Sequence, residues 1–204
     1  MKIICVGRNY AAHAKELNNA VPETPLIFLK PETALLPRNH PFFYPEFSND
    51  IHFETELVVR INRLGKHISV NHAHKYYNEI GIGIDFTARD IQKECKQKGL
   101  PWERAKSFDH SAPVGTKFML LKDLPNPQKI SFHLEKNGEI VQNGNSSDMI
   151  FSIDTIIAYV STFLTLKIGD LIFTGTPEGV GPVQIGDRLE AFVENQRLLR
   201  VNVR

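Results

Sequence analysis

Apolar and polar side chains alternate most regularly between Ile51 and Arg60, and this alternation predicts a β-strand. A period of two places Glu54 and Glu56 on the same face of that strand. Two carboxylates at this spacing repel each other, so either water or a bound cation has to compensate their charge. On spacing alone, the simpler interpretation is the wet face of a half-buried strand. The alternative is a site for a hard divalent cation such as Mg²⁺ or Mn²⁺, because these ions prefer carboxylate oxygens.

Short apolar runs elsewhere in the chain predict further strands, separated by a few helices and by loops rich in proline and glycine. Strands and helices do not alternate regularly, so we expect an α+β fold with mixed sheets and not a doubly wound parallel sheet. The predicted strands are 2–6, 26–31, 80–86, 117–121, 171–173, 189–193 and 198–203, with a hairpin over 129–142 that turns at Asn137-Gly138. The predicted helices are 9–19, 71–78, 87–98 and 152–164.

The ends of two of these helices follow from single residues. Thr87 is expected to cap the helix that stops before Gly99. Ser152 is expected to cap the last helix, whose apolar stripe extends to Phe163 and is expected in the core. The segment 101–113 is expected to be a loop.

The composition limits the classes of function to consider. The chain has 204 residues, of which 42% are hydrophobic, and this suits one domain over residues 1–204. Its net charge of +1 gives no electrostatic reason to expect nucleic acid or an anionic membrane as a partner. No apolar run approaches the roughly 20 residues of a membrane helix. Cys5 and Cys95 form no CxxC motif and the first residues form no signal peptide, so we expect a cytoplasmic location.

A few polar residues are candidates for chemistry. His13 and Glu16 are three apart, so they share a helix face, either as a solvated pair or as a histidine base oriented by a carboxylate. Asp85 ends an apolar strand and is a candidate third metal ligand. Lys30 ends another strand and is either a cation of the site or, as strand-end lysines more often are, solvated. Lys106 lies in a loop and, taken alone, is expected at the surface. The motifs of an α/β-hydrolase serine, a zincin and a Walker loop are absent.

Five short motifs in order along the chain resemble those of the fumarylacetoacetate hydrolase family. The similarity is greatest to its short, single-domain acylpyruvate hydrolase members, and it covers nearly the whole chain. The motifs are Phe28-Leu29-Lys30-Pro31, Glu54-Thr55-Glu56-Leu57, Asp85-Phe86-Thr87-Ala88-Arg89-Asp90, Ala105-Lys106-Ser107-Phe108-Asp109 and Thr174-Gly175-Thr176-Pro177-Glu178-Gly179-Val180-Gly181-Pro182.

The resemblance implies a mixed β-sheet roll with a few short helices, which usually forms a homodimer. It implies that one Mg²⁺ or Mn²⁺ ion is held by Glu54, Glu56 and Asp85. It also implies a catalytic dyad of His13 and Glu16 on a mobile N-terminal lid helix, residues 9–19.

Lys106 is expected beside the substrate, as a third catalytic residue. Arg89, Gln92 and Thr176 match family positions that contact the carboxylate or oxo group of a 2-oxo acid.

The resemblance implies, as its first expectation, a metal-dependent hydrolase that cleaves the C–C bond of acylpyruvates to give pyruvate and a carboxylic acid. In this mechanism His13 activates water, and Lys106 stabilises the oxyanion. The same site chemistry suits oxaloacetate decarboxylation, keto–enol tautomerisation and isomerisation of an unsaturated diacid, so these alternatives stay open. A metal-stabilised binding protein without turnover is a further alternative, but it leaves His13, Glu16 and Lys106 without a role.

Overall fold

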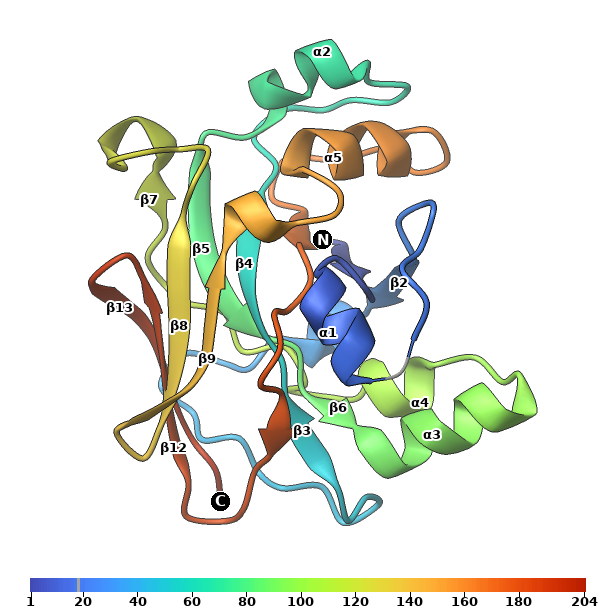
Figure 1. The fold of residues 1–204 in the computed structure, drawn as a ribbon, viewed down its shortest axis with the longest axis vertical. Helices are drawn as coiled ribbons and strands as arrows, with labels where there is room; N and C mark the ends of the chain where they lie inside the picture. The colour runs from blue at the N-terminus through green and yellow to red at the C-terminus, as the bar shows by residue number, and fades with distance from the viewer. Residues whose placement is uncertain (18) are drawn as a thin grey trace.

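The computed structural model of the chain describes residues 1–17 and 19–204. In that part of the chain the strands form one six-stranded, one three-stranded and one four-stranded sheet (Figure 1). The six-stranded sheet has the order β2 (Ile27–Lys30), β1 (Ile3–Val6), β10 (Leu171–Phe173), β4 (Thr55–Arg60), β5 (Glu79–Ile84) and β7 (Met119–Leu120). The three-stranded sheet is β11 (Gly181–Pro182), β3 (Ile51–Phe53) and β6 (Thr87–Ala88). The four-stranded sheet is β13 (Gln196–Asn202), β12 (Arg188–Val193), β8 (Ser131–Lys136) and β9 (Glu139–Asn145).

The six-stranded sheet is mixed, because β1 and β10 are parallel while its other paired strands are antiparallel. The two smaller sheets are antiparallel. The helices are short: α1 (Ala11–Glu16), α2 (Val70–Ala73), α3 (Arg89–Lys98), α4 (Glu103–Lys106) and α5 (Ile153–Ser161). Single 3₁₀ turns lie at Glu32–Ala34, His74–Tyr76, Leu121–Asp123 and Ser146–Asp148. This architecture confirms the predicted α+β fold. None of the helices in the described residues is long and apolar enough to cross a membrane.

The six-stranded sheet is covered on both faces. Ile4, Leu57 and Ile82 point into the large hydrophobic core, whereas Cys5 and Val58 belong to a second buried cluster on the other face. Strands that are buried on both sides read as continuous apolar runs, and such runs predicted β1, β5 and β10. The β4 strand was predicted from alternation instead. Cys5 is therefore a core residue, as the apolar strand around it indicated.

Local turn and capping chemistry is confirmed at three places. Asn137 and Gly138 have φ angles of 57° and 88°, as a type I′ hairpin turn between β8 and β9 requires. Gly99 ends α3 with a φ angle of 64°, in the left-handed region. The side chain of Ser152 accepts a hydrogen bond from the backbone N–H of Thr155 and caps α5.

Four local predictions are wrong. The strand predicted over 51–60 is interrupted at Glu54, whose carbonyl oxygen accepts a hydrogen bond from the Asp85 N–H, so β3 and β4 belong to different sheets. Thr87 lies in β6 and does not cap α3, because its hydroxyl points to other partners described below. The loop predicted over 101–113 contains α4. Phe163 is 48% exposed, since α5 ends at Ser161 before the stripe reaches it.

The helix predicted over 9–19 is shorter in the structure. The observed α1 runs from Ala11 to Glu16, and Asn18 lies outside the described residues. The helix still carries both members of the predicted dyad.

Asp170 ties the start of β10 to the start of the chain. Its carboxylate accepts hydrogen bonds from the backbone N–H groups of Lys2 and Lys167, both at 2.8 Å, and pairs with the Lys2 ammonium at 2.5 Å. Burial works to raise the pKa of Asp170, but these hydrogen bonds and the Lys2 charge lower it below its ordinary value.

We expect Asp170→Asn to reduce the free energy of unfolding by about 2 kcal/mol at neutral pH, because the hydrogen bonds lose a charged acceptor. A lowered folded-state pKa gives stability that is present above the unfolded pKa and is lost as the pH falls through the folded pKa. The difference between wild type and variant should therefore be constant from pH 5 to 8 and shrink below pH 4. Urea denaturation across this range measures it; a difference that does not change with pH would contradict the charge-based explanation.

Candidate active site

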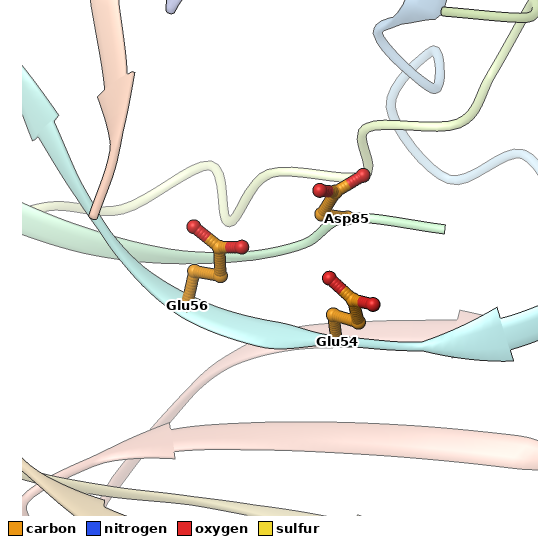
Figure 2. A group of neighbouring side chains, drawn as sticks. All are labelled: Glu54, Glu56 and Asp85. Atoms are coloured by element: carbon orange, nitrogen blue, oxygen red, sulfur yellow. The ribbon is translucent and has the colours of Figure 1, made fainter. Parts of the chain in front are cut away.

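Glu54, Glu56 and Asp85 meet at the place where β3 ends and β4 begins (Figure 2). Glu56 lies in β4, opposite Gly83 of β5, and Asp85 follows the end of β5. The antiparallel pairing of β4 with β5 therefore brings Asp85 beside the two glutamates. Ligand oxygens of the three side chains lie within 4.8 Å of one another, and all three residues are buried. The interpretation of a wet strand face is wrong, while the predicted grouping of the three carboxylates is observed.

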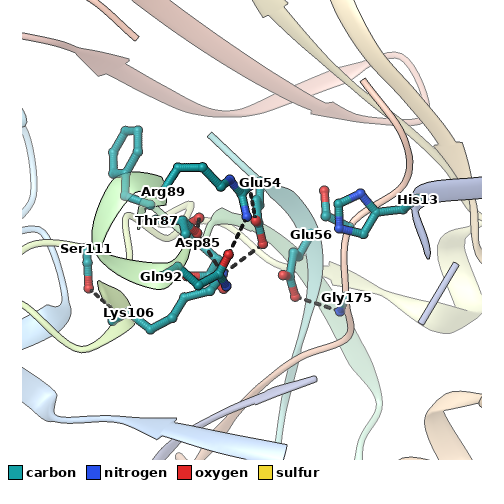
Figure 3. Close-up of polar contacts among 12 residues, drawn as sticks. His13, Glu54, Glu56, Asp85, Thr87, Arg89, Gln92, Lys106, Ser111 and Gly175 are labelled. Atoms are coloured by element: carbon teal, nitrogen blue, oxygen red, sulfur yellow. Dashed lines mark hydrogen bonds and ion pairs between the residues drawn. The ribbon is translucent and has the colours of Figure 1, made fainter. Parts of the chain in front are cut away.

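Two lysines and an arginine contact this cluster, and Figure 3 labels two of the three, Lys106 and Arg89. The Lys106 ammonium lies 2.8 Å from Glu54 Oε2, 2.7 Å from Asp85 Oδ2 and 2.6 Å from the hydroxyl of Thr87. Arg89 Nη2 donates to Glu54 Oε1 at 2.5 Å. Spacing alone suggested solvated carboxylates. In the structure, Glu54 and Asp85 instead form buried ion pairs with basic side chains.

Lys30 is buried and forms an ion pair with Asp85 Oδ1 at 2.8 Å. Its ammonium also donates to Ser111 Oγ at 2.9 Å and to the carbonyl oxygen of Lys106. The expectation of a solvated Lys30 is therefore wrong, as it is for Lys106, which is 2% exposed. Local sequence gives no signal for either burial. Lys30 and Thr87 lie in two of the motifs that resemble the family. Those motifs were the only feature of the sequence that could have placed either residue at the site.

The surrounding charges act differently on the two glutamates. Burial works to raise the pKa of Glu54, but the ion pairs with Lys106 and Arg89 hold it well below its usual range. Burial also raises the pKa of Glu56, and the negative charges of Asp85 and Glu54 raise it further, against weaker opposing effects of Lys106 and a Gly175 hydrogen bond. Glu56 is thus the member of the cluster that most lacks a positive partner.

A divalent cation fits this arrangement. Among the described residues, no basic side chain lies within ion-pair distance of Glu56, whose Oε2 accepts only the Gly175 backbone N–H, at 2.6 Å. Three convergent carboxylates are the donor set that Mg²⁺ and Mn²⁺ prefer. Glu54, Glu56 and Asp85 are therefore the residues that could hold such an ion.

His13 and Glu16 form the hydrogen-bonded pair that the sequence predicts. His13 Nδ1 and Glu16 Oε2 are 3.1 Å apart, and Glu16 Oε1 accepts from the backbone N–H of Gly179 at 3.0 Å. His13 is 3% exposed, so a solvated surface pair does not describe it. Figure 3 shows the imidazole on the side of the cluster where Glu56 lies.

The three predicted substrate residues have different surroundings. Arg89 Nη1 donates to Gln92 Oε1 at 2.7 Å at the start of α3, and the same guanidinium reaches Glu54. The Thr176 hydroxyl donates to the Thr55 carbonyl oxygen and accepts from Gln142, both at 2.9 Å. Arg89 and Gln92 thus lie at the cluster together, while the Thr176 hydroxyl is bonded to the protein.

The loop 174–182 connects the cluster to the dyad. Gly175 has a φ angle of 95°, and a Cβ built there would lie 2.6 Å from Asn9 Cβ. Asn9 is buried and donates to the carbonyl oxygens of Phe151 and Thr174, so it has no room to move away. Only glycine combines this backbone conformation with the Gly175 N–H bond to Glu56.

We expect Gly175→Ala to lower the free energy of unfolding by about 2–4 kcal/mol, since backbone strain and overpacking add. Metal affinity should fall as well, because the N–H that orients Glu56 is displaced. Gly186→Ala is the matched control: its φ angle is 100°, but a Cβ there meets nothing within 4 Å. Chemical denaturation and Mn²⁺ titration of both variants test this; equal losses would mean that backbone strain alone explains the effect.

Residues 2–204 match the family described as fumarylacetoacetate (FAA) hydrolase C-terminal. Two curated relatives are similar over nearly their whole length. "Oxaloacetate tautomerase FAHD1, mitochondrial" from Mus musculus is 45% identical over 202 residues, covering 99% of this chain and 91% of the relative. "Oxaloacetate tautomerase YcgM" from Escherichia coli (strain K12) is 43% identical over 197 residues, covering 97% of this chain and 90% of the relative.

Among solved structures, fumarylpyruvate hydrolase from Pseudomonas aeruginosa, in complex with Mn²⁺ and pyruvate, superimposes with a TM-score of 0.93 at 36% identity. The match covers 100% of this chain and 89% of the other.

Proposed function

Because the chain belongs to the fumarylacetoacetate hydrolase family, we propose that it is a divalent-metal-dependent enzyme acting on 2-oxo diacids, with oxaloacetate keto–enol tautomerisation as its reaction. The curated relatives described above, at 43–45% identity, carry this activity in their names. The sequence alone favoured acylpyruvate hydrolysis, and this reaction becomes the second candidate.

The charge balance of the buried cluster carries the proposal. Three carboxylates, Glu54, Glu56 and Asp85, are matched by three cations, Lys30, Lys106 and Arg89. A divalent cation would leave the site with an excess charge of about +2, and uncompensated buried charge is costly. A dianion such as oxaloacetate or fumarylpyruvate restores neutrality, whereas a monoanion such as acetylpyruvate does so only in part. The charge balance therefore supports a diacid substrate, and the names of the relatives favour oxaloacetate among the diacids.

The dyad supplies the proton transfer. If the Nδ1–H of His13 donates to Glu16, the other ring nitrogen, Nε2, keeps its lone pair and can act as a base. Tautomerisation needs one proton removed from the carbon between the oxo group and the second carboxylate, and one delivered to the oxo oxygen. Lys106 and Arg89 place positive charge beside Glu54, where they can stabilise the charge that develops on that oxygen. A bound Mg²⁺ or Mn²⁺ would add Lewis-acid polarisation of the oxo group.

Acylpyruvate hydrolysis uses the same groups with one change: His13 takes its proton from water, and the hydroxide attacks the second carbonyl carbon. The bond between that carbon and the pyruvate methylene then breaks, which leaves a carboxylic acid, and the departing pyruvate enolate takes up a proton to give pyruvate. The structural similarity to a fumarylpyruvate hydrolase favours this second candidate. Decarboxylation of oxaloacetate and isomerisation of an unsaturated diacid remain alternatives that the same residues could serve, and a metal-binding protein without turnover is the alternative from another class.

The deciding experiment follows the absorbance of enol-oxaloacetate with purified protein, with added Mg²⁺ and with EDTA. We expect metal-dependent acceleration of its decay to the keto form, without release of pyruvate. Parallel assays measure pyruvate release from acetylpyruvate and from fumarylpyruvate. Rapid release from either, with no effect on enol-oxaloacetate, would replace tautomerisation by hydrolysis. Pyruvate formed from oxaloacetate would identify decarboxylation.

Several further expectations from the sequence are part of this proposal. They are a single catalytic domain over residues 1–204, a mobile lid around α1, Mg²⁺ or Mn²⁺ as the cofactor, a homodimer and a cytoplasmic location. Light scattering at micromolar concentration tests the dimer; a monomer over the whole concentration range would count against it.

A further inference from the structure

Gln142 is buried on β9 and touches two of the segments that form the carboxylate cluster. Its Oε1 accepts a hydrogen bond from the backbone N–H of Thr55 at 2.9 Å. Its Nε2 donates to Thr176 Oγ1 at 2.9 Å and to the carbonyl oxygen of Pro177 at 3.1 Å. Thr55 lies directly between Glu54 and Glu56, so Gln142 contacts the backbone that carries both carboxylates.

The contacts close into a cycle. Thr55 N–H donates to Gln142, Gln142 donates to Thr176, and the Thr176 hydroxyl donates to the Thr55 carbonyl oxygen at 2.9 Å. All three residues are buried. A hydroxyl has one hydrogen, and here the protein uses it. The Thr176 hydroxyl can therefore accept a hydrogen bond from a ligand but cannot donate one while the cycle is intact.

The cycle replaces strand pairing that ends just before the cluster. On one side, β4 pairs with β5 as far as Thr55. On the other side, the ladder with β10 ends at Phe173 and Val58, after which Thr174 still bonds to the Leu57 carbonyl. The next backbone N–H and C=O groups of β4 that point away from β5 are those of Thr55. The side chains of Gln142 and Thr176 form the hydrogen bonds to them. A buried peptide group without a partner costs about 1–3 kcal/mol, so these bonds hold the segment in place.

We propose that Gln142 is a positioning residue that, together with Thr176, fixes the Thr55 peptide and thereby directs the flanking Glu54 and Glu56 carboxylates toward a divalent cation. The inference rests on the metal site of the proposed function, and it does not depend on which reaction the enzyme catalyses. An amide is required, since the position needs one acceptor, for Thr55, and two donors, for Thr176 and Pro177.

The test measures Mn²⁺ affinity by titration, with free Mn²⁺ followed by electron paramagnetic resonance. Gln142→Leu and Thr176→Val should each raise the Kd for Mn²⁺ about 10- to 100-fold, as loss of groups that orient metal ligands does. The double variant should bind Mn²⁺ no more weakly than the single variant with the higher Kd, because either change alone opens the cycle of hydrogen bonds. Thr176→Ser keeps the hydroxyl, so its Kd for Mn²⁺ should stay close to that of the wild type. Gln196→Leu is the matched control, since Gln196 is exposed at the start of β13 in the same sheet.

A second measurement needs no metal. Hydrogen exchange in metal-free protein should accelerate at least 10-fold for the segment 54–57 in Gln142→Leu and Thr176→Val, and should not change in the control. Variants that lower Tm while leaving Mn²⁺ affinity and exchange at wild-type values would overturn the proposal and make Gln142 an ordinary core residue. Thr176→Val, nearly equal in volume to threonine, carries the test if Gln142→Leu does not fold. Wild-type protein that binds no Mn²⁺ would overturn the proposed function, and exchange would then decide the positioning role alone.

Discussion

Replacing His13 with alanine should lower kcat by a factor of about 10²–10⁴, the range that a positioned general acid–base group contributes. His13 is buried beside the carboxylate cluster, and its Nδ1 is engaged by Glu16, so its free nitrogen is the available base. His13 does not belong to the group of three carboxylates that could hold the metal ion. The Kd for Mn²⁺ should therefore remain close to wild type. Steady-state rates and Mn²⁺ titration on the same preparation measure both quantities.

Two further variants sharpen this test. Glu16→Gln keeps an oxygen that can accept the His13 hydrogen bond but removes the charge, so its kcat should fall less, by about tenfold. His72→Ala changes an exposed histidine on α2 and should leave kcat unchanged. Full turnover in His13→Ala would show that the dyad assignment is wrong, whichever substrate is turned over. Loss of Mn²⁺ binding in the same variant would instead indicate that the imidazole supports the metal site.

The contrast between Glu54, Glu56 and the residues around them shows what the local pattern can determine. Period two correctly placed the two glutamates on one face. Whether that face is wet depends on what covers it, and here the cover comes from α4 and from the loop 174–182, more than 45 residues away in the chain. No pattern within β4 contains that information.

Thr87 and Lys30 also show that local sequence cannot reveal contacts made by distant parts of the chain. Thr87 has the right chemistry for a helix cap, but its hydroxyl bonds to Lys106 and to the Asp85 carbonyl oxygen, so a contact formed by the fold overrides the local preference. Lys30 lies 76 positions from Lys106, whose carbonyl oxygen it contacts. Strand-end lysines are ordinarily solvated, and only the resemblance of the surrounding motif to a family indicated otherwise.

The loop 174–182 joins the parts of the candidate site into one unit. Its backbone bonds to Glu56 through Gly175 and to Glu16 through Gly179, and its Thr176 side chain bonds to Thr55. One segment therefore contacts a metal ligand, the dyad and the backbone between the two glutamates. Substitutions in this loop should change metal affinity and proton transfer together, whereas His13→Ala separates them.

Replacing Glu56 with glutamine should have opposite effects on the metal-free and the metal-bound protein. Glutamine has the same shape and keeps an oxygen for the Gly175 N–H, so the fold should be retained. Without metal, the variant should be more stable than wild type, because a buried carboxylate facing Asp85 and Glu54 is removed. With metal, a charged ligand is lost, so the Kd for Mn²⁺ should rise by more than the roughly 10- to 100-fold cost of losing an outer-shell partner. Metal-dependent turnover should fall in parallel.

Thermal unfolding with EDTA and with saturating Mn²⁺ measures both effects on one sample. The wild-type Tm should rise on adding Mn²⁺, because an ion that binds only the folded state stabilises it by mass action. Glu56→Gln should start from a higher Tm in EDTA and gain little from Mn²⁺. Glu139→Gln, an exposed glutamate at the β8–β9 hairpin, is the matched control and should behave as wild type in both conditions. A lower Tm in EDTA for Glu56→Gln would mean that its carboxylate stabilises the metal-free fold. A full gain from Mn²⁺ would mean that the ion is held elsewhere, because the cluster can lose this charge at no cost only if it is not the metal site.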